Sequence, residues 1–152
     1  MIGMCLVALA TLEASAATSR SAVGTWKLNV SRSSYGNMPG PKYEKLVVTT
    51  DQPDAVKWLL TGASGDGKTF VSMYNGPIDG KGRPYGNSQV GNSIAYTRTA
   101  AGLDWVVKNK SGGVVETGSG LLSPDGSTLT LKGTTQGPSG NANFVSVFER
   151  VQ

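Results

Sequence analysis

Residues 23–30 read Val-Gly-Thr-Trp-Lys-Leu-Asn-Val. The side chains of Trp26, Leu28 and Val30 are apolar. The residues that alternate with them, Thr25, Lys27 and Asn29, are polar. A period of two is typical of a β-strand that buries one face and exposes the other. The stretch therefore predicts a strand whose inner face carries a tryptophan near the beginning of the chain.

The same rhythm continues to the end of the sequence. Short apolar runs alternate with clusters of Gly, Pro, Asn and Asp, which have hairpin length and turn chemistry. No window shows a helical period of 3.6 residues, and no crossover is long enough for parallel pairing. We predict an all-β protein, an antiparallel up-and-down meander closed into a barrel of eight or nine strands, since closure removes bare edges. After the first strand, the predicted strands are 43–50, 55–61, 69–75, 93–99, 103–109, 114–122, 128–134 and 143–151.

Composition limits the function. The chain has 152 residues, which is the size of one domain, with 21 glycines, no histidine and a single cysteine, Cys5. Histidine-dependent catalytic triads, histidine-bearing zinc sites and cysteine-ligated clusters are therefore excluded, and no cofactor is expected. The net charge of +4 is spread along the chain, so we expect no nucleic-acid partner, which would need a clustered basic patch.

The amino terminus predicts export. Residues 2–10 form an apolar run, and Ala14-Ser15-Ala16 places small residues before a cut at Ala17. The run is shorter than the roughly 20 residues that span a bilayer, so we expect no stable membrane insertion. We predict a signal peptide over residues 1–16, a barrel domain over 17–152 and a secreted or periplasmic protein. The alternative is an apolar segment that stays and packs.

The two ends of the chain carry a resemblance. Gly24-Thr25-Trp26-Lys27-Leu28 resembles the Gly-x-Trp opening of lipocalins and fatty-acid-binding proteins, and 147–151 (Val-Phe-Glu-Arg-Val) is similar to the ending of the same calycin barrels. The opening is also similar to that of small exported bacterial lipocalin-like proteins. The resemblance implies that Trp26 closes one end of the barrel and that Arg150 lies across its indole.

The chain departs from fatty-acid-binding proteins at two places. Ser146 occupies the position where that family carries an arginine that grips the fatty-acid carboxylate, and residues 31–42 are too rich in Gly and Pro for the family's helical lid. The domain also lacks the disulfides that are usual in lipocalins. Fatty-acid binding is therefore not carried over from the resemblance.

Residues 62–69 (Gly-Ala-Ser-Gly-Asp-Gly-Lys-Thr) fit the P-loop pattern letter for letter. A P-loop needs a following helix whose N-terminus holds the phosphates, and here a strand follows. We predict a hairpin turn at this position.

The predicted inner face combines large aromatic side chains with a few polar groups, a mixture that suits a small apolar or amphipathic ligand. Few acids are expected there. An inward arginine at position 98 would need an anionic ligand group or a buried acid, whereas at the rim it would meet water. In the long loop 76–92, Lys81, Arg83 and Tyr85 form either an anion-binding flap or a plain surface loop. The candidate ligand-binding residues are Trp58, Phe70, Tyr74, Tyr96, Arg98, Trp105 and Phe148.

Three functions remain open at this point. The first is a carrier or sensor of a small apolar molecule, which we favour. The second is a barrel enzyme of the cyclase or isomerase type that acts by confinement, with no catalytic residue singled out by the sequence. The third is a structural or assembly module with a filled interior, which would self-associate through an outer patch at Val145 and Val147.

Overall fold

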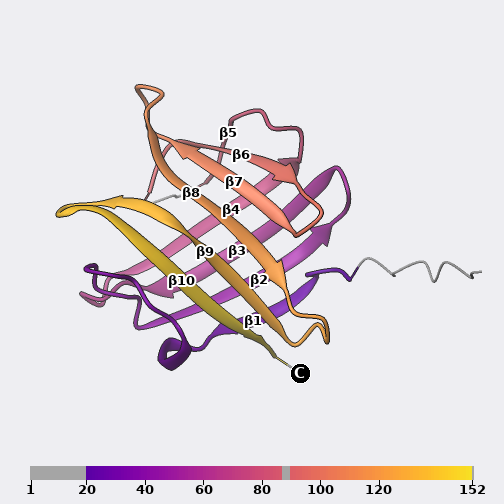
Figure 1. Cartoon of the computed structure of the whole chain (residues 1–152), viewed down its shortest axis with the longest axis horizontal. Helices are drawn as coiled ribbons and strands as arrows, with labels where there is room; N and C mark the ends of the chain where they lie inside the picture. Colours follow the sequence, from indigo (N-terminus) through magenta and orange to yellow (C-terminus); the bar gives the residue numbers. More distant parts are fainter. Residues whose placement is uncertain (1–19, 87–89, 152) are drawn as a thin grey trace, which may run out of the picture.

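The computed structural model describes residues 20–86 and 90–151, and the predicted signal peptide lies outside these ranges. The described chain forms a single antiparallel sheet of ten strands that curls into a nearly closed barrel (Figure 1). The order of the strands in the sheet is β4-β3-β2-β1-β10-β9-β8-β7-β6-β5. The strands are β1 (Gly24–Leu28), β2 (Tyr43–Asp51), β3 (Ala55–Ala63), β4 (Thr69–Pro77), β5 (Arg83–Pro84), β6 (Ser93–Arg98), β7 (Leu103–Lys108), β8 (Val114–Leu122), β9 (Thr128–Gly137) and β10 (Gly140–Arg150).

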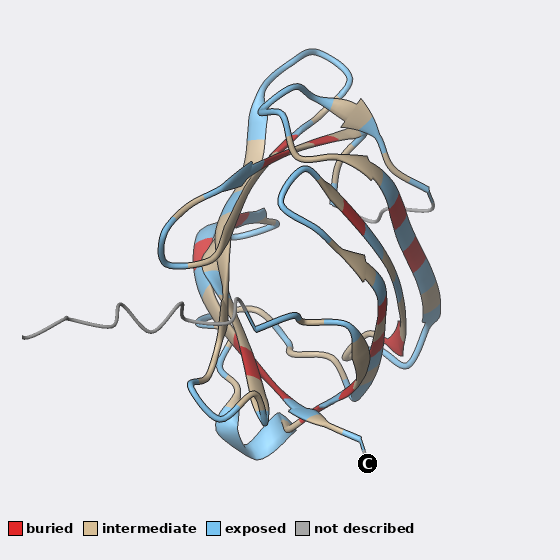
Figure 2. Cartoon of the chain, turned by 90° about the vertical axis from the view of Figure 1, so that its right-hand side faces the viewer, coloured by how far each residue is buried: buried red, intermediate tan, exposed pale blue. Residues whose placement is uncertain are grey.

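The predicted fold class is confirmed, with one correction to the strand count. Each of the nine predicted runs contains a strand, and β5 is an additional short strand within the predicted loop 76–92. The first strand ends at Leu28, so Val30 lies outside it and is exposed. Buried and exposed positions alternate along the strands (Figure 2). The described residues contain one short 3-10 turn, Val30–Arg32, and no helix there is long and apolar enough to cross a membrane.

The barrel closes at two seams of different strength. At the first seam, β1 pairs with β10 over three residues, with Trp26 opposite Arg150. At the second, the two ends of the sheet meet through a single bridge, in which the backbone amides and carbonyls of Met73 and Gly86 exchange hydrogen bonds of 3.0 and 2.9 Å. The segment 78–86 therefore fills the gap between β4 and β6.

Trp26 and Arg150 make the contact that the resemblance implied. The Trp26 side chain is fully buried, and its indole N–H donates to the carbonyl of Ala22 at 2.8 Å. The Arg150 guanidinium carbon lies 4.2 Å from the centre of the indole ring, in cation–π geometry. The guanidinium also donates to the carbonyls of Ser21, Val23 and Gly126.

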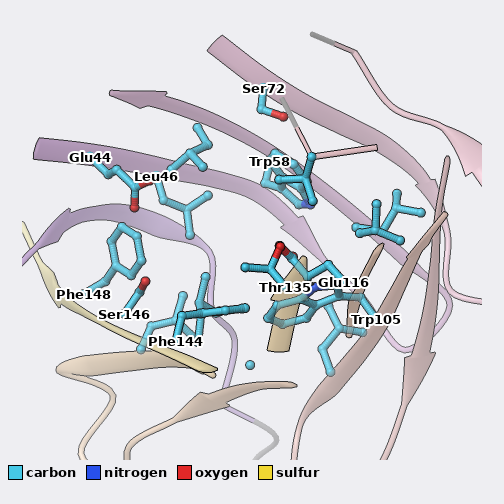
Figure 3. Close-up of a pocket in the computed structure, with 18 of the residues that line it drawn as sticks. Glu44, Leu46, Trp58, Ser72, Trp105, Glu116, Thr135, Phe144, Ser146 and Phe148 are labelled. Carbon is cyan, nitrogen blue, oxygen red and sulfur yellow. Dashed lines mark hydrogen bonds between the residues drawn. The ribbon is translucent and has the colours of Figure 1, made fainter. Parts of the chain in front are cut away.

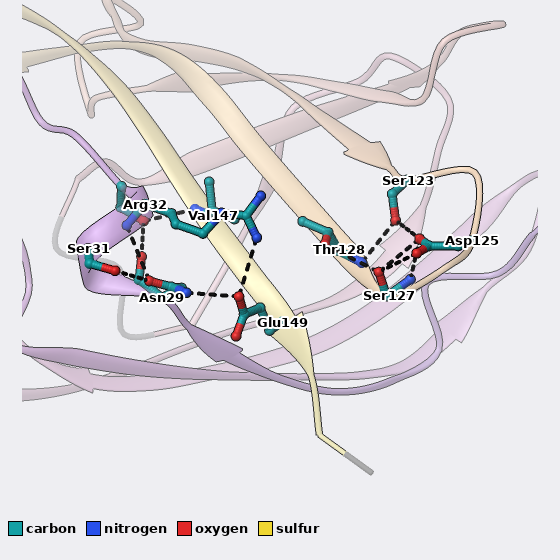
Figure 4. A network of polar contacts seen from close by, with 10 residues as sticks. Asn29, Ser31, Arg32, Ser123, Asp125, Ser127, Thr128, Val147 and Glu149 are labelled. Atoms are coloured by element: carbon teal, nitrogen blue, oxygen red, sulfur yellow. Dashed lines mark hydrogen bonds and ion pairs between the residues drawn. The ribbon is translucent and has the colours of Figure 1, made fainter.

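The segment after β1 covers the outside of β10 and then crosses one end of the barrel. Asn29 and Ser34 bond to the backbone of β10 on either side of the 3-10 turn, so Val147 is buried rather than part of an exposed patch. On this outer surface, the Glu149 carboxylate accepts from the side chains of Asn29 and Arg32 (Figure 4). We call residues 35–42 the strap: its Met38 lies against Gly137, the last residue of β9, and its Pro39 lies against Gly65 in the turn that follows β3.

The segment that fits the P-loop pattern is the β3–β4 hairpin. The Ser64 amide donates to the Lys68 carbonyl, the Gly67 amide donates to the Ser64 carbonyl, and Lys68 forms an ion pair with Asp66 at the surface. A tight turn between two antiparallel strands has no helix N-terminus to receive phosphate groups. The predicted hairpin is confirmed.

Candidate ligand-binding cavity

A cavity of about 980 Å³ occupies the interior of the barrel (Figure 3). Small-molecule sites in proteins usually measure roughly 300–1,000 Å³. The lining extends from the strap at one end to Asp51, Arg98 and the β6–β7 turn at the other. The interior is therefore hollow along much of the barrel.

One half of the cavity wall is apolar. Leu46, Val48, Leu129 and Phe148 are buried around Trp26 and present their outer atoms to the cavity. These positions come from β1, β2, β9 and β10, which are neighbours in the sheet. This cluster forms the apolar floor of the cavity, at the end of the barrel that Trp26 closes.

Trp105 is accommodated because its neighbour on β8 has no side chain. A Cβ atom at Gly118 would collide with the Trp105 indole, which lies flat over that position. The Phe144 ring stacks against the same indole with its centroid 6.5 Å away. The glycine therefore determines how the largest aromatic group of this wall is oriented.

An aromatic cluster bridges the second seam of the barrel. The Trp58 indole N–H donates to the Tyr96 hydroxyl at 2.9 Å, which links β3 to β6. Tyr74 packs edge-on against Tyr96 with centroids 5.0 Å apart, and Tyr85 packs edge-on against Trp58 at 6.4 Å. Burial raises the pKa of the Tyr96 hydroxyl, so this group stays neutral at physiological pH.

The half of the cavity beneath the strap carries polar side chains, which lie beside the aromatic rings of Phe70 and Phe144. The Tyr35 hydroxyl, from the strap, lies 2.9 Å from the Ser146 hydroxyl of β10. Glu44 of β2 and Glu116 of β8 line the same half from different walls, and Glu116 accepts a 2.9 Å hydrogen bond from the indole N–H of Trp105 (Figure 3). Two half-buried carboxyl groups thus face one interior space.

The environment of these carboxyl groups favours their protonated forms. Burial, reinforced by the charge of Glu116, raises the pKa of Glu44 from 4.5 to about 7. Burial also raises the pKa of Glu116, against the opposing effect of hydrogen bonds from Trp105 and Thr135. A buried carboxylate without a counter-charge is costly, so these two groups hold their protons to higher pH than exposed acids do.

The structure places six of the seven predicted ligand-binding residues on the cavity wall, and Tyr74 behind it. Tyr74 is buried in the seam and donates to the carbonyl of Pro77. Arg98 lies at the rim, where it forms a 2.6 Å ion pair with Asp51 and donates to the Gln52 carbonyl. Its charge is therefore matched within the chain. The six residues that line the cavity are Trp58, Phe70, Tyr96, Arg98, Trp105 and Phe148.

The proposed flap residues are separated from one another. Arg83 forms an ion pair with Asp79 within the same segment, Tyr85 lines the cavity against Trp58, and Lys81 is exposed. The described part of this loop, 78–86, forms neither an anion-binding flap nor a plain surface loop. It fills the second seam, and its Tyr85 ring lines the cavity.

Sequence reasoning missed the two interior acids and Tyr35. The alternation of β2 gives a signal for Glu44, which has the same parity as Leu46 and Val48. The expectation that few acids face the interior overlooked this parity. In the described ranges, no group of three or more Asp, Glu, His or Cys residues could hold a metal ion.

Comparison with known proteins gives a likeness in fold. No protein-family model and no curated protein matches the sequence. Among solved structures, the chain is similar to a zebrafish ileal bile acid-binding protein complexed with cholic acid, with 14% identity and a TM-score of 0.51. The match covers 86% of this chain and all of the other. The likeness is one of fold: an antiparallel barrel, as the sequence predicted.

Proposed function

We propose that this chain is an exported barrel that binds a small apolar or amphipathic molecule in its interior. The observation that carries the proposal is the cavity of about 980 Å³, whose floor consists of buried aliphatic and aromatic side chains. Cavities of this kind bind apolar ligands and use a few polar groups to orient them. The zebrafish protein of similar fold was crystallised with such an amphipathic molecule, cholic acid.

A fluorescence titration tests the binding. The neutral dye N-phenyl-1-naphthylamine brightens in an apolar environment, so we expect saturable brightening with one dye per folded chain. Unfolding the chain in urea should abolish it. A folded chain that leaves the dye fluorescence unchanged would contradict the proposal.

Export belongs to the proposal and rests on the apolar run 2–10 and the small residues before Ala17. When the full sequence is produced in a bacterium, we expect the mature protein in the periplasm with Ala17 as its first residue. Mass spectrometry of that fraction checks this. A product that retains residues 1–16 would contradict the proposed cleavage and would mean that the apolar segment stays in the mature protein.

A barrel enzyme is the second candidate, and the cavity carboxyls favour it. A group whose pKa is about 7, as for Glu44, can give or take a proton at neutral pH. Chromatography of the bound molecule before and after incubation separates the two functions. Recovery of the unchanged molecule supports a carrier, and conversion that Glu44→Gln abolishes supports an enzyme.

The assembly-module hypothesis fits the structure less well. It requires a filled interior, whereas the barrel is hollow. It also requires an apolar patch on the outer face of β10, where Val147 is covered by the segment that follows β1.

A further inference from the structure

Three strands of the cavity wall change from polar to apolar along the barrel axis. On β2, β8 and β9, a polar lining residue lies nearer the strap and an apolar one nearer Trp26, whereas on β10 Ser146 lies between Phe144 and Phe148. A molecule lying along the axis would therefore meet a different chemistry at each end. The pairs are Glu44 and Leu46 on β2, Glu116 and Leu122 on β8, and Thr135 and Leu131 on β9.

The polar half is acidic, and no basic side chain from the described residues lines it. Arg98 is engaged by Asp51 at the other end of β2, seven residues from Glu44, or about 20 Å at the rise of a strand. Arg20 lines the cavity next to Ala22, whose amide donates to the same Asp51. The remaining titratable groups on the wall are Tyr35, Tyr85 and Tyr96.

The Glu44 carboxyl group has hydrogen-bonding and ion-pairing capacity that the described residues do not use. Among the described residues it accepts no hydrogen bond and forms no ion pair, and the like charge of Glu116 raises its pKa further. Two carboxyl groups that face one interior space repel each other when both are ionised. A positive charge placed between them would remove that repulsion and allow both to ionise.

We propose that the barrel selects cationic amphipaths, with a protonated amine held beneath the strap by Glu44 and Glu116 and an apolar body lying against the floor around Trp26. This inference rests on the proposed ligand-binding function and adds the chemical class of the ligand. A carboxylate head group at the same place would add a third negative charge. The net charge of the whole chain is +4, so non-specific attraction would favour anions, and a preference for cations must come from the cavity itself.

Three probes with the same tail and different head groups test the proposal: dodecylamine, dodecanol and dodecanoate, each kept below its micelle concentration. Their binding at pH 8 can be measured by displacement of N-phenyl-1-naphthylamine. We expect dodecylamine to bind at least tenfold more tightly than dodecanoate. In Glu44→Gln/Glu116→Gln, the preference should fall to within about threefold.

A matched control removes a carboxylate from the outer surface. Glu149→Gln removes one carboxylate at an exposed position, the same change of charge as in either single cavity variant, and it should leave the preference intact. The single variants Glu44→Gln and Glu116→Gln give smaller losses of preference, and they serve if the double variant does not fold.

The outcomes separate the two proposals. If neither the dye nor any dodecyl probe binds, the barrel is not a carrier of such molecules and both proposals fail. If the dye binds but dodecanol or dodecanoate binds as tightly as dodecylamine, the carrier stands and the selection of cations is overturned. If Glu44→Gln/Glu116→Gln still prefers dodecylamine over dodecanoate, the selection of cations by these two carboxyl groups is also overturned.

Discussion

The indole N–H of Trp58 in β3 donates a 2.9 Å hydrogen bond to the Tyr96 hydroxyl in β6, across the seam where the two ends of the sheet meet. The backbone contributes one bridge to this seam, at Met73 and Gly86, and a hydrogen bond from the Gly80 amide to the Tyr96 carbonyl. Side chains must therefore supply most of the attraction between the two edges. The wall of the cavity and the closure of the barrel depend on the same aromatic cluster.

Tyr96→Phe tests this dependence. The substitution leaves the ring in place but removes the only acceptor of the Trp58 N–H that the described contacts show. An unsatisfied donor in a partly buried site costs about 1–3 kcal/mol, and we expect a loss of that size in the free energy of unfolding measured in urea. Tyr43→Phe, at an exposed position, is the control and should change little. Equal stabilities of the two variants would show that the bond does not support the seam.

Truncation of Trp26 tests the closed end of the barrel. Trp26→Ala should destabilise the fold by about 3–5 kcal/mol, because a fully buried large ring leaves a cavity. Val30→Ala, at an exposed position near the same strand, should stay within about 0.5 kcal/mol of the parent. Thermal or urea unfolding checks both values. An unchanged stability in Trp26→Ala would remove the structural role of the contact with Arg150.

The alternation of residues was sufficient to predict the fold, since Trp26 and Leu28 define an inner face and most of the later runs repeat it. The short β5 was not predicted, because Arg83–Pro84 is a two-residue pairing in a Gly- and Pro-rich segment with no period to detect. The hydrogen-bonded seam between Trp58 and Tyr96 joins residues 38 positions apart and depends on the curvature of the whole sheet.

The candidate site was predicted less completely than the fold. Aromatic lining such as Trp105 followed from parity, but Glu116 shares its parity with Gly118, which carries no hydrophobic signal. Tyr35 lies on the strap, where no regular period exists, so only the path of the chain over the barrel end brings it to Ser146. The polar half of the cavity is thus a property of the closed structure.

Gly118→Val tests how the aromatic wall is shaped. The added side chain would meet the Trp105 indole and force the ring into the cavity. We expect at least tenfold weaker binding of N-phenyl-1-naphthylamine and a destabilisation of about 1–3 kcal/mol from overpacking. Thr117→Val, the exposed neighbour on the same strand, is the control and should retain binding. Normal dye affinity in Gly118→Val would mean that the ligand does not use this wall.

The raised pKa of Glu44 predicts an unusual dependence of stability on pH. In the folded chain this carboxyl has a pKa of about 7, against an ordinary value of 4.5 in the unfolded chain. Between these two pH values the folded state holds a proton that the unfolded state has released, so the stabilising contribution is complete below pH 4.5 and is lost as the pH rises to 7. The expected decrease in the free energy of unfolding is about 2–3 kcal/mol across that interval, and Glu116, whose pKa is also raised, acts in the same direction.

Two substitutions isolate the contribution of Glu44. Glu44→Gln keeps the shape but cannot ionise, so the fall in stability between pH 4.5 and pH 7 should become shallower. Glu149→Gln is the matched control, because hydrogen bonds from Asn29 and Arg32 lower the pKa of Glu149, and its contribution is lost only as the pH falls below the ordinary range of an acid. Urea unfolding at half-unit steps of pH measures both variants against the parent. A parent protein whose stability rises between pH 4.5 and pH 7, or a Glu44→Gln variant with an unchanged slope, would show that this carboxyl is ionised in the empty barrel.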